Sequence, residues 1–135
     1  MADAFLGRYR LLSRIAVGGM GEVYLASADG AANFSKKVAI KRILPHLAKN
    51  PEFVAKFIDE ANLMVQLTHG NIVPVLELAD QGGELFLVME YIPGRDLRAV
   101  IKRTKSQEKF IPTDLAIWLL SEICAGLHYA HRKTD

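Results

Sequence analysis

A cluster of glycines between two β-rich segments constrains this chain more than any other feature. Gly18, Gly19 and Gly21 follow residues 9–15, which read as a strand, and precede the alternating apolar pattern of residues 23–26. Alternation with a period of two is typical of a half-buried β-strand. Residues 38–41 are again β-rich. Successive strands with short connections favour an antiparallel meander over parallel crossover units.

A helix and two further strands follow the meander. The helix is predicted to begin at Asn50 and Pro51, because asparagine can cap free backbone amides and proline fits the first helical turn. Gly70 is its predicted end. Strands over residues 71–78 and 85–91 then complete a set of five strands, with a turn between them.

Two more helices are predicted in the last third of the chain. Residues 95–109 are polar and mostly basic, which indicates a short helix followed by a loop. The next helix extends from about Pro112 to His131 and is apolar on nearly every side. Such a helix requires burial on most sides, and too little chain remains to cover it. Cys124, on this helix, is interpreted as a core residue.

The composition excludes several classes of protein. Half of the 135 residues are hydrophobic and 24% are charged, which rules out disorder and low-complexity arrays. A formal net charge of +2 does not indicate a nucleic-acid partner. The single cysteine excludes an internal disulfide, and no apolar stretch approaches the roughly twenty residues of a membrane-spanning helix. We therefore expect a soluble, cytoplasmic chain with no membrane segment.

Lys41 and Glu60 are candidate partners in an ion pair. Glu60 borders the apolar face of the predicted helix, next to Met64. One interpretation is a surface pair with Lys56, four residues earlier, worth roughly a few tenths of a kcal/mol. The other is a pair with Lys41 on the sheet, because a carboxylate beside an apolar face requires a nearby cation.

These segments resemble, in order, the motifs of protein kinases. Residues 15–24, Ile-Ala-Val-Gly-Gly-Met-Gly-Glu-Val-Tyr, are similar to the glycine-rich loop, and residues 38–41, Val-Ala-Ile-Lys, match the third-strand lysine motif. Glu60 resembles the C-helix glutamate, residues 88–92 the fifth strand and hinge, and residues 126–131 the long E-helix. The sequence around the glycines is most similar to bacterial, eukaryotic-like serine/threonine protein kinases.

The resemblance implies an α+β fold and a division of the chain. A kinase-like N-lobe, with a five-stranded antiparallel sheet and the C-helix, would be followed by the first helices of the C-lobe. Residues 1–8 would be an N-terminal extension, residues 9–92 the N-lobe and hinge, and residues 93–135 the start of the C-lobe, ending before the catalytic loop.

The resemblance also implies an ATP-binding site. The glycine-rich loop would cover the phosphates, while Lys41 holds the α- and β-phosphates and Glu60 holds Lys41. Val23 and Ala39 would pack on the adenine beside a gatekeeper, Met89. Backbone groups of the hinge would bond the adenine edge. The residues assigned to nucleotide binding are Ile15, Ala16, Gly18, Gly19, Gly21, Val23, Ala39, Lys41, Met89, Glu90, Ile92 and Asp96.

Three of the implied positions carry a second interpretation. Ala16 stands where the pattern has its first glycine, which alanine can replace wherever φ is negative. Asp96 either meets the ribose or caps the helix that follows it. Met64 either belongs to a packed column that reports the position of the C-helix or is plain core.

Phosphoryl transfer in this family requires catalytic residues that have no counterpart among the 135 residues of this chain. They are a catalytic-loop aspartate, an asparagine and the aspartate of Asp-Phe-Gly, which binds magnesium. Lys133 follows His131 and Arg132, where a His-Arg-Asp motif has its aspartate. We therefore expect the ATP-binding portion of a serine/threonine kinase, with magnesium ligands outside this chain, a protein substrate for the full-length enzyme and no activity for the chain alone.

Other interpretations are weaker. A non-catalytic nucleotide-sensing or docking module would require the apolar helix to be covered by a partner or by a second copy. Nucleic-acid binding through the basic residues 95–109 is disfavoured, because no aromatic side chain interleaves the charges. His128 and His131 have helical spacing for a metal site but no third ligand nearby, so we expect no metal site.

Overall fold

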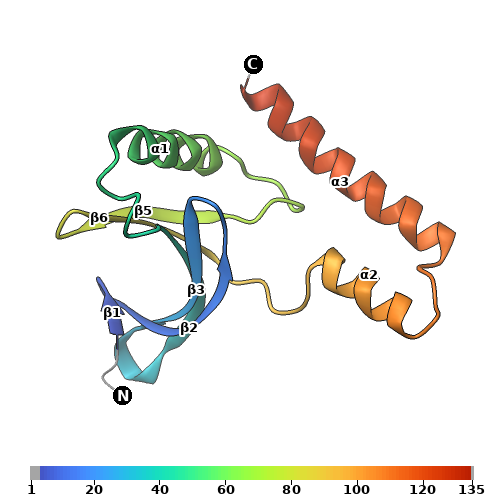
Figure 1. The fold of residues 1–135 in the computed structure, drawn as a ribbon, viewed down its shortest axis with the longest axis horizontal. Coiled ribbons are helices and arrows are strands. Elements are labelled where there is room, and N and C mark those ends of the chain that lie inside the picture. Colours follow the sequence, from blue (N-terminus) through green and yellow to red (C-terminus); the bar gives the residue numbers. More distant parts are fainter. Residues whose placement is uncertain (1–3, 135) are drawn as a thin grey trace. The chain divides into compact units, whose positions relative to one another are not determined.

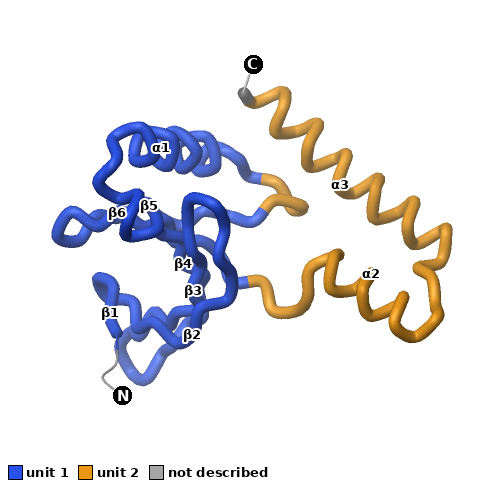
Figure 2. Tube along the Cα trace, viewed as in Figure 1, with its two compact units in different colours: residues 1–68, 73–91 blue, residues 69–72, 92–135 orange. Residues whose placement is uncertain are grey.

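The computed structural model describes residues 4–134. Residues 1–3 of the predicted N-terminal extension and Asp135 at the end of the predicted C-lobe segment lie outside the described residues. Two compact units make up the chain (Figure 2). Unit 1 comprises residues 1–68 and 73–91, and unit 2 comprises residues 69–72 and 92–135.

Unit 1 is a curled antiparallel sheet with one long helix, α1 (Pro51–Val65), packed against it (Figure 1). The described residues form six strands in the order β1-β2-β3-β4-β6-β5. A short 3₁₀ helix, η1 (Ala31–Asn33), joins the third strand to the fourth. The strands are β1 (Ala4–Leu6), β2 (Tyr9–Val17), β3 (Gly21–Asp29), β4 (Ser35–Ile43), β5 (Val75–Gln81) and β6 (Glu84–Glu90).

The predicted strand count of five was wrong by one. The five predicted strands are present, and β1 adds a sixth by pairing Ala4 with Leu11 and Leu6 with Tyr9. With three residues, β1 is too short to show a recognisable strand pattern. The start of β5 was also misplaced, because the strand begins at Val75, after Pro74, which lacks the N–H that a ladder requires.

The start of α1 was predicted correctly, and its end was not. The Asn50 side chain accepts a hydrogen bond from the Glu52 amide at 3.0 Å, and proline occupies the first turn. The helix ends at Val65 instead of near Gly70. The Gln66 N–H donates to the Leu63 carbonyl at 3.1 Å. This tighter i→i−3 bond closes the last turn without a glycine.

The β5–β6 turn shows why the predicted turn carries two glycines. Gly82 and Gly83 have φ of 62° and 84°. A two-residue hairpin loop of this kind needs positive φ at both positions, which side chains other than glycine rarely accept. Asp80 also accepts a hydrogen bond from the Gly83 amide at 2.9 Å.

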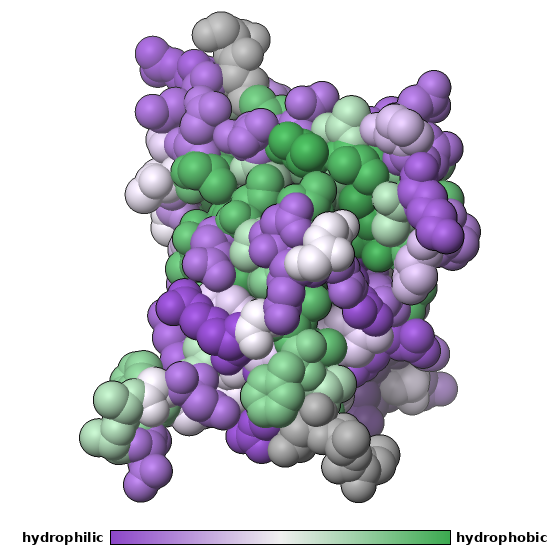
Figure 3. All heavy atoms as spheres, turned by 90° about the vertical axis from the view of Figure 1, so that its left-hand side faces the viewer, coloured by the Kyte–Doolittle hydropathy of each residue, from purple (hydrophilic) through white to green (hydrophobic). Residues whose placement is uncertain are grey.

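Apolar side chains form separate clusters on the two faces of the sheet. One cluster comprises Leu6, Tyr9, Ala26, Val38, Ile40, Phe86 and Val88. The other lies between α1 and the sheet and comprises Ile43, Phe57, Ala61 and Leu87, with Met64 packed beside it. Met64 is therefore a core residue, whatever further role it has. Figure 3 shows apolar side chains gathered in the upper centre of one face, with hydrophilic ones around them.

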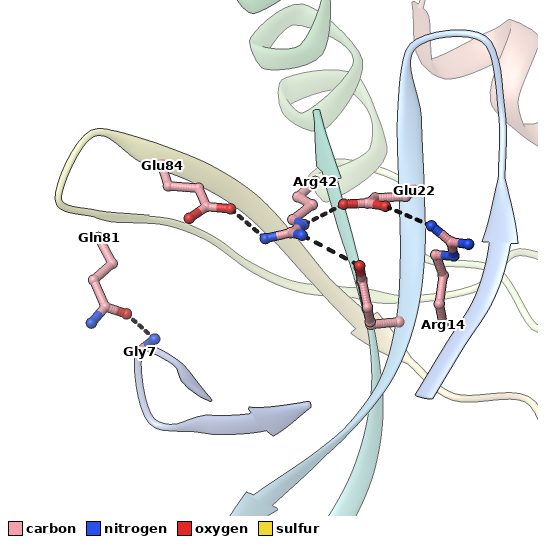
Figure 4. Close-up of polar contacts among 7 residues, drawn as sticks. Gly7, Arg14, Glu22, Arg42, Gln81 and Glu84 are labelled. Carbon is pink, nitrogen blue, oxygen red and sulfur yellow. Dashed lines mark hydrogen bonds and ion pairs between the residues drawn. The ribbon is translucent and has the colours of Figure 1, made fainter. Parts of the chain in front are cut away.

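The β1–β2 turn and the start of β2 are connected to β5, at the other end of the sheet order, by side chains. Tyr9 donates its hydroxyl to Glu77 of β5 at 2.8 Å, and Arg8 lies 3.4 Å from the same carboxylate. The Gly7 amide donates to the Gln81 side chain (Figure 4). Burial raises the pKa of Tyr9, the hydrogen bond to Glu77 raises it further, and the neighbouring Arg8 opposes both effects. These contacts hold the sheet in its curled form.

Unit 2 contains α2 (Leu97–Ser106), α3 (Thr113–Thr134) and the segment of residues 69–72. Asn71 anchors this segment to α3, because its amide donates to the Glu122 carbonyl at 2.9 Å and to the Glu122 carboxylate at 2.8 Å. Both helices were predicted close to their observed bounds. In the part of the chain that is described, no helix is long and apolar enough to cross a membrane.

The apolar surface of α3 is largely uncovered. Ile117 is 63% exposed and Leu120 is 61% exposed. Cys124 is exposed as well, so its interpretation as a core residue was wrong. Among the described residues, no apolar layer packs over this face of the helix, although cysteine is of a type that is usually buried.

Candidate functional site

The Lys41–Glu60 ion pair connects the sheet to α1. Lys41 Nζ lies 2.6 Å from Glu60 Oε1. β4, which carries Lys41, pairs with β3 on one side and with β6 on the other, so the lysine lies in the interior of the sheet. The competing partner, Lys56, lies over the Phe53 ring instead. The predicted pair between the sheet and the helix is confirmed.

The exposure of this pair limits what it contributes to stability. The Lys41 side chain is 27% exposed and the Glu60 side chain is 41% exposed. An ion pair so open to solvent stabilises a fold by about 1 kcal/mol or less. A cavity of about 20 Å³ beside the pair is bounded by Met20 and Phe53, among others. The pair therefore orders two side chains at a small cavity more than it stabilises the unit.

The glycine-rich loop joins β2 to β3 and lies beside the end of β4, where Gly21 pairs with Ile43. The Gly18 N–H donates to the Gly21 carbonyl at 2.7 Å, and the Leu44 N–H donates to the Met20 carbonyl at 3.0 Å. A Cβ at Gly21 would stand 2.9 Å from the Arg42 carbonyl oxygen, whereas a Cβ at Gly19 would meet nothing within 4 Å. None of the loop glycines has positive φ. Close backbone approach, and not an unusual dihedral, is therefore why glycine is required at position 21.

Ala16 is compatible with its position. It lies within β2, where it pairs with Val23, and its φ is not in the left-handed region. An alanine is tolerated wherever φ is negative. The departure of Ala16 from the glycine pattern thus does not strain the backbone. Ile15, just before it, is exposed.

Apolar residues of the predicted site continue the face that carries Lys41. Along β4, Ala39 and Lys41 point to the same side. Val23 pairs with Lys41, and Met89 pairs with Ala39. Ala39 is buried, whereas Val23 and Met89 are half-buried. A strip of small and medium apolar side chains therefore extends from the ion pair across three neighbouring strands.

The remaining predicted residues have individual environments. The Glu90 amide donates to the Pro74 carbonyl at 3.0 Å, so that N–H is already used. Ile92 and Asp96 belong to unit 2, where Ile92 is exposed. Asp96 accepts a hydrogen bond from the Ala99 amide at 2.7 Å. Its interpretation as the cap of α2 is confirmed, and a contact with ribose stays a prediction.

Sequence reasoning missed a charged cluster on the opposite face of the sheet (Figure 4). Glu22, whose side chain is only 5% exposed, accepts a hydrogen bond from Arg42 Nε at 2.6 Å. Arg14 lies 3.7 Å from the other Glu22 oxygen, and Glu84 accepts from Arg42 at 2.8 Å. The sequence did contain a signal for this cluster, because the alternation of β3 places the charged Glu22 on the same side as the apolar Ala26.

A larger cavity and the histidines do not belong to the predicted site. The cavity has a volume of about 450 Å³ and lies between the β5–β6 turn and the start of α1. Neither Lys41, Glu60 nor any loop glycine lines it. Among residues 4–134, no group of three or more histidine, cysteine or acidic residues is arranged to hold a metal ion.

Comparison with known proteins identifies the family. A family model described as "Protein tyrosine and serine/threonine kinase" matches residues 9–134. The chain therefore belongs to the protein kinase family. Its curled sheet and helices correspond to the N-lobe and the start of the C-lobe of such a kinase.

The relatives include bacterial kinases of two kinds. The tyrosine-protein kinase MasK of Myxococcus xanthus is 40% identical over 129 residues, which are 96% of this chain and 20% of MasK. The serine/threonine-protein kinase PknD of Chlamydia muridarum is 35% identical over 133 residues, which are 93% of this chain and 14% of PknD. The chain thus spans a fifth or less of the length of these relatives.

Solved structures agree on the fold. The kinase domain of Mycobacterium tuberculosis PknI superposes with a TM-score of 0.74 at 23% sequence identity. The match covers 98% of this chain and 52% of that kinase domain. At this level of identity the likeness defines the fold alone.

Proposed function

We propose that this chain is the ATP-binding portion of a protein kinase, which in the full-length enzyme transfers a phosphoryl group from ATP to a protein serine or threonine. The observation that supports this most directly is the 2.6 Å pair between Lys41 and Glu60. In protein kinases, a lysine of the third strand pairs with a helix glutamate before phosphoryl transfer is competent.

The chemistry of each group follows from its place. Lys41 presents a cation to the α- and β-phosphates, while Glu60 holds the lysine amine in one direction. The backbone of the loop from Ala16 to Gly21 covers the phosphates without interfering side chains. Val23, Ala39 and Met89 provide an apolar surface for the adenine ring.

We further propose that the 135 residues alone transfer no phosphoryl group. No residue among them matches the catalytic-loop aspartate or the aspartate of Asp-Phe-Gly. Magnesium neutralises phosphate charge in this reaction, and its ligands are expected in the residues that these 135 do not include. The donor groups described above do not fit a magnesium site, so this chain contributes phosphate and adenine contacts only.

We assign serine or threonine as the acceptor residue because the sequence around the glycine-rich loop is similar to that of serine/threonine kinases. MasK is named a tyrosine kinase and PknD a serine/threonine kinase, so relatives of both kinds exist. Phosphoamino-acid analysis of protein substrates treated with the full-length enzyme distinguishes them. Phosphotyrosine alone would overturn the serine/threonine assignment and leave the kinase assignment standing.

A titration of the chain with ATP tests the proposed site. Weak binding is expected, because the contacts supplied by the rest of a kinase are absent, so nuclear magnetic resonance at high nucleotide concentration is the suitable method. Amide shifts should occur at Gly18 to Gly21 and around Lys41, and Lys41→Met should abolish them. Because the lysine is partly exposed, this variant is expected to fold. Shifts elsewhere, or shifts unchanged in Lys41→Met, would contradict the site.

A second function is favoured by one observation. The uncovered apolar side chains of α3, such as Ile117 and Leu120, are what a non-catalytic nucleotide-sensing or docking module would present to a partner or to a second copy. Light scattering separates the two functions. A stable, monodisperse assembly supports the docking module, whereas progressive aggregation supports the proposal that the chain is the ATP-binding portion of a kinase.

A further inference from the structure

We propose that Glu22 is a positioning residue, which together with Arg14 and Arg42 clamps the glycine-rich loop in register with Lys41. The inference deepens the proposed function and rests on it, because the position of the loop affects nucleotide binding only if the loop covers the phosphates. We call Arg14, Glu22 and Arg42 the loop clamp.

The loop clamp bridges the strands that enter and leave the loop. Glu22 follows Gly21 directly and is the cross-strand partner of Arg42. Its Oε1 accepts from Arg42 Nε at 2.6 Å, and its Oε2 lies 3.7 Å from an Arg14 nitrogen (Figure 4). Arg14 lies on β2, which leads into the loop, and Arg42 lies on β4. One buried carboxylate therefore binds both stems of the loop to the strand that carries Lys41.

The clamp acts from the face opposite the ion pair. Lys41 and Arg42 are neighbours in β4, so their side chains leave the strand on opposite sides. Lys41 turns toward α1 and pairs with Glu60, whereas Arg42 turns toward Glu22. The clamp residues are thus expected to touch no nucleotide themselves. Their effect passes through the backbone, since Gly21 lies so close to β4 that a Cβ on it would stand 2.9 Å from the Arg42 carbonyl oxygen.

Arg42 is itself held in place from two further directions. Its guanidinium donates to Glu84 at 2.8 Å and to the Tyr24 hydroxyl at 3.3 Å, and it lies over the Tyr24 ring. Burial by itself would lower the pKa of Arg42, but its hydrogen bonds to Glu22, Glu84 and Tyr24 outweigh burial and raise it. The cation opposite Glu22 is therefore permanent and oriented.

The loop clamp is not expected to stabilise the fold more than a well-packed apolar pair would. Burying a carboxylate carries a desolvation penalty that its ion pairs roughly repay, so well-packed apolar residues of similar volume often stabilise a fold as much or more. What the charge-assisted hydrogen bond from Arg42 adds, together with the ion pair to Arg14, is a fixed direction for the Glu22 side chain. Because Glu22 comes immediately after the glycine-rich loop, the direction of its side chain determines where the loop amides point.

The experiment compares ATP with adenosine, because only ATP carries the groups that the loop covers. The 135-residue chain, Glu22→Gln and a matched control, Glu77→Gln, are titrated with each ligand by nuclear magnetic resonance. Glu77 is also a carboxylate paired to an arginine, but on β5 away from the loop. Glu22→Gln should reduce the ratio of ATP to adenosine affinity about tenfold, as expected for one weakened charge-assisted contact. Glu77→Gln should leave the ratio unchanged.

The outcomes separate the inference from the proposed function. A Glu22→Gln chain that keeps the ratio, or that loses affinity for both ligands equally, overturns the clamp and leaves the proposed function standing. An unmodified chain that binds neither ligand overturns both. Amide hydrogen exchange gives a direct readout of the loop, because Gly18 N–H should exchange faster in Glu22→Gln and not in Glu77→Gln.

A second variant covers a failure to fold. If Glu22→Gln does not fold, Glu22→Gln with Arg42→Gln removes both charges and leaves no unpaired ion in the interior. The same fall in the affinity ratio is then expected, and an unchanged ratio overturns the clamp.

Discussion

The backbone of Gly21 lies so close to Arg42 that a Cβ on the glycine would stand 2.9 Å from the Arg42 carbonyl oxygen. The obstructing atom belongs to the central strand β4, which cannot shift without disturbing its pairing on both sides. This contact joins the glycine-rich loop to the strand of Lys41 independently of any side chain.

Gly21→Ala should therefore destabilise unit 1. Overpacking against a fixed backbone costs about 1–3 kcal/mol, which chemical denaturation measures as a lower free energy of unfolding. Gly19→Ala is the matched control, because a Cβ there meets nothing within 4 Å. Equal stability of the two variants would contradict the proposed close approach.

Glu60→Gln should separate binding from stability. Because both partners are partly exposed, the free energy of unfolding should fall by about 1 kcal/mol or less. ATP-dependent amide shifts should weaken, since the Lys41 amine loses the group that directs it. Asp59→Asn, a neighbouring exposed carboxylate, is the control and should change neither quantity. A large loss of stability with unchanged ATP shifts would assign Glu60 a structural role.

Tyr9 should make the stability of unit 1 sensitive to alkaline pH. Burial raises the pKa of its phenol above the usual 10.0. Between about pH 10 and the raised value, the unfolded chain has lost this proton and the folded chain retains it. The folded state binds more protons in this range, so the free energy of unfolding falls as the pH rises.

Tyr9→Phe tests that pH dependence. It removes the phenol proton and also the hydrogen bond to Glu77. The difference in unfolding free energy between the unmodified chain and Tyr9→Phe should be constant near neutral pH and shrink above about pH 10. Denaturation curves at several pH values measure it. A difference that does not change with pH would show that Tyr9 titrates equally in both states.

The exposed apolar side chains of α3 should cause the chain to self-associate. Replacing Ile117 and Leu120 by glutamate should lower the mass measured by light scattering, because both are more than 60% exposed. Helical content should persist, since glutamate favours helices. Ser121→Glu, which adds a charge on the same exposed helix without removing an apolar group, should leave association unchanged. Equal effects of the two changes would attribute association to net charge.

Local sequence patterns predicted the helices and strands that are long enough for a pattern to extend over several residues. Alternation located β3, strand-like segments at residues 9–15, 38–41 and 85–91 located β2, β4 and β6, and Asn50 with Pro51 located the start of α1. These signals are readable because side-chain direction in a strand or a helix depends on the residue's own neighbours along the chain. Elements of three residues, such as β1, are too short to carry the pattern.

The sequence by itself determined the order of strands and helices and the residue types of the candidate site, including Lys41 and Glu60. Only the tertiary structure decided that Glu22 meets Arg42, that Gly21 needs its missing side chain for space, and that Cys124 is exposed. Each of these depends on strand register or on what packs over a helix face. Both are set by contacts between residues far apart in the chain, which no local pattern contains.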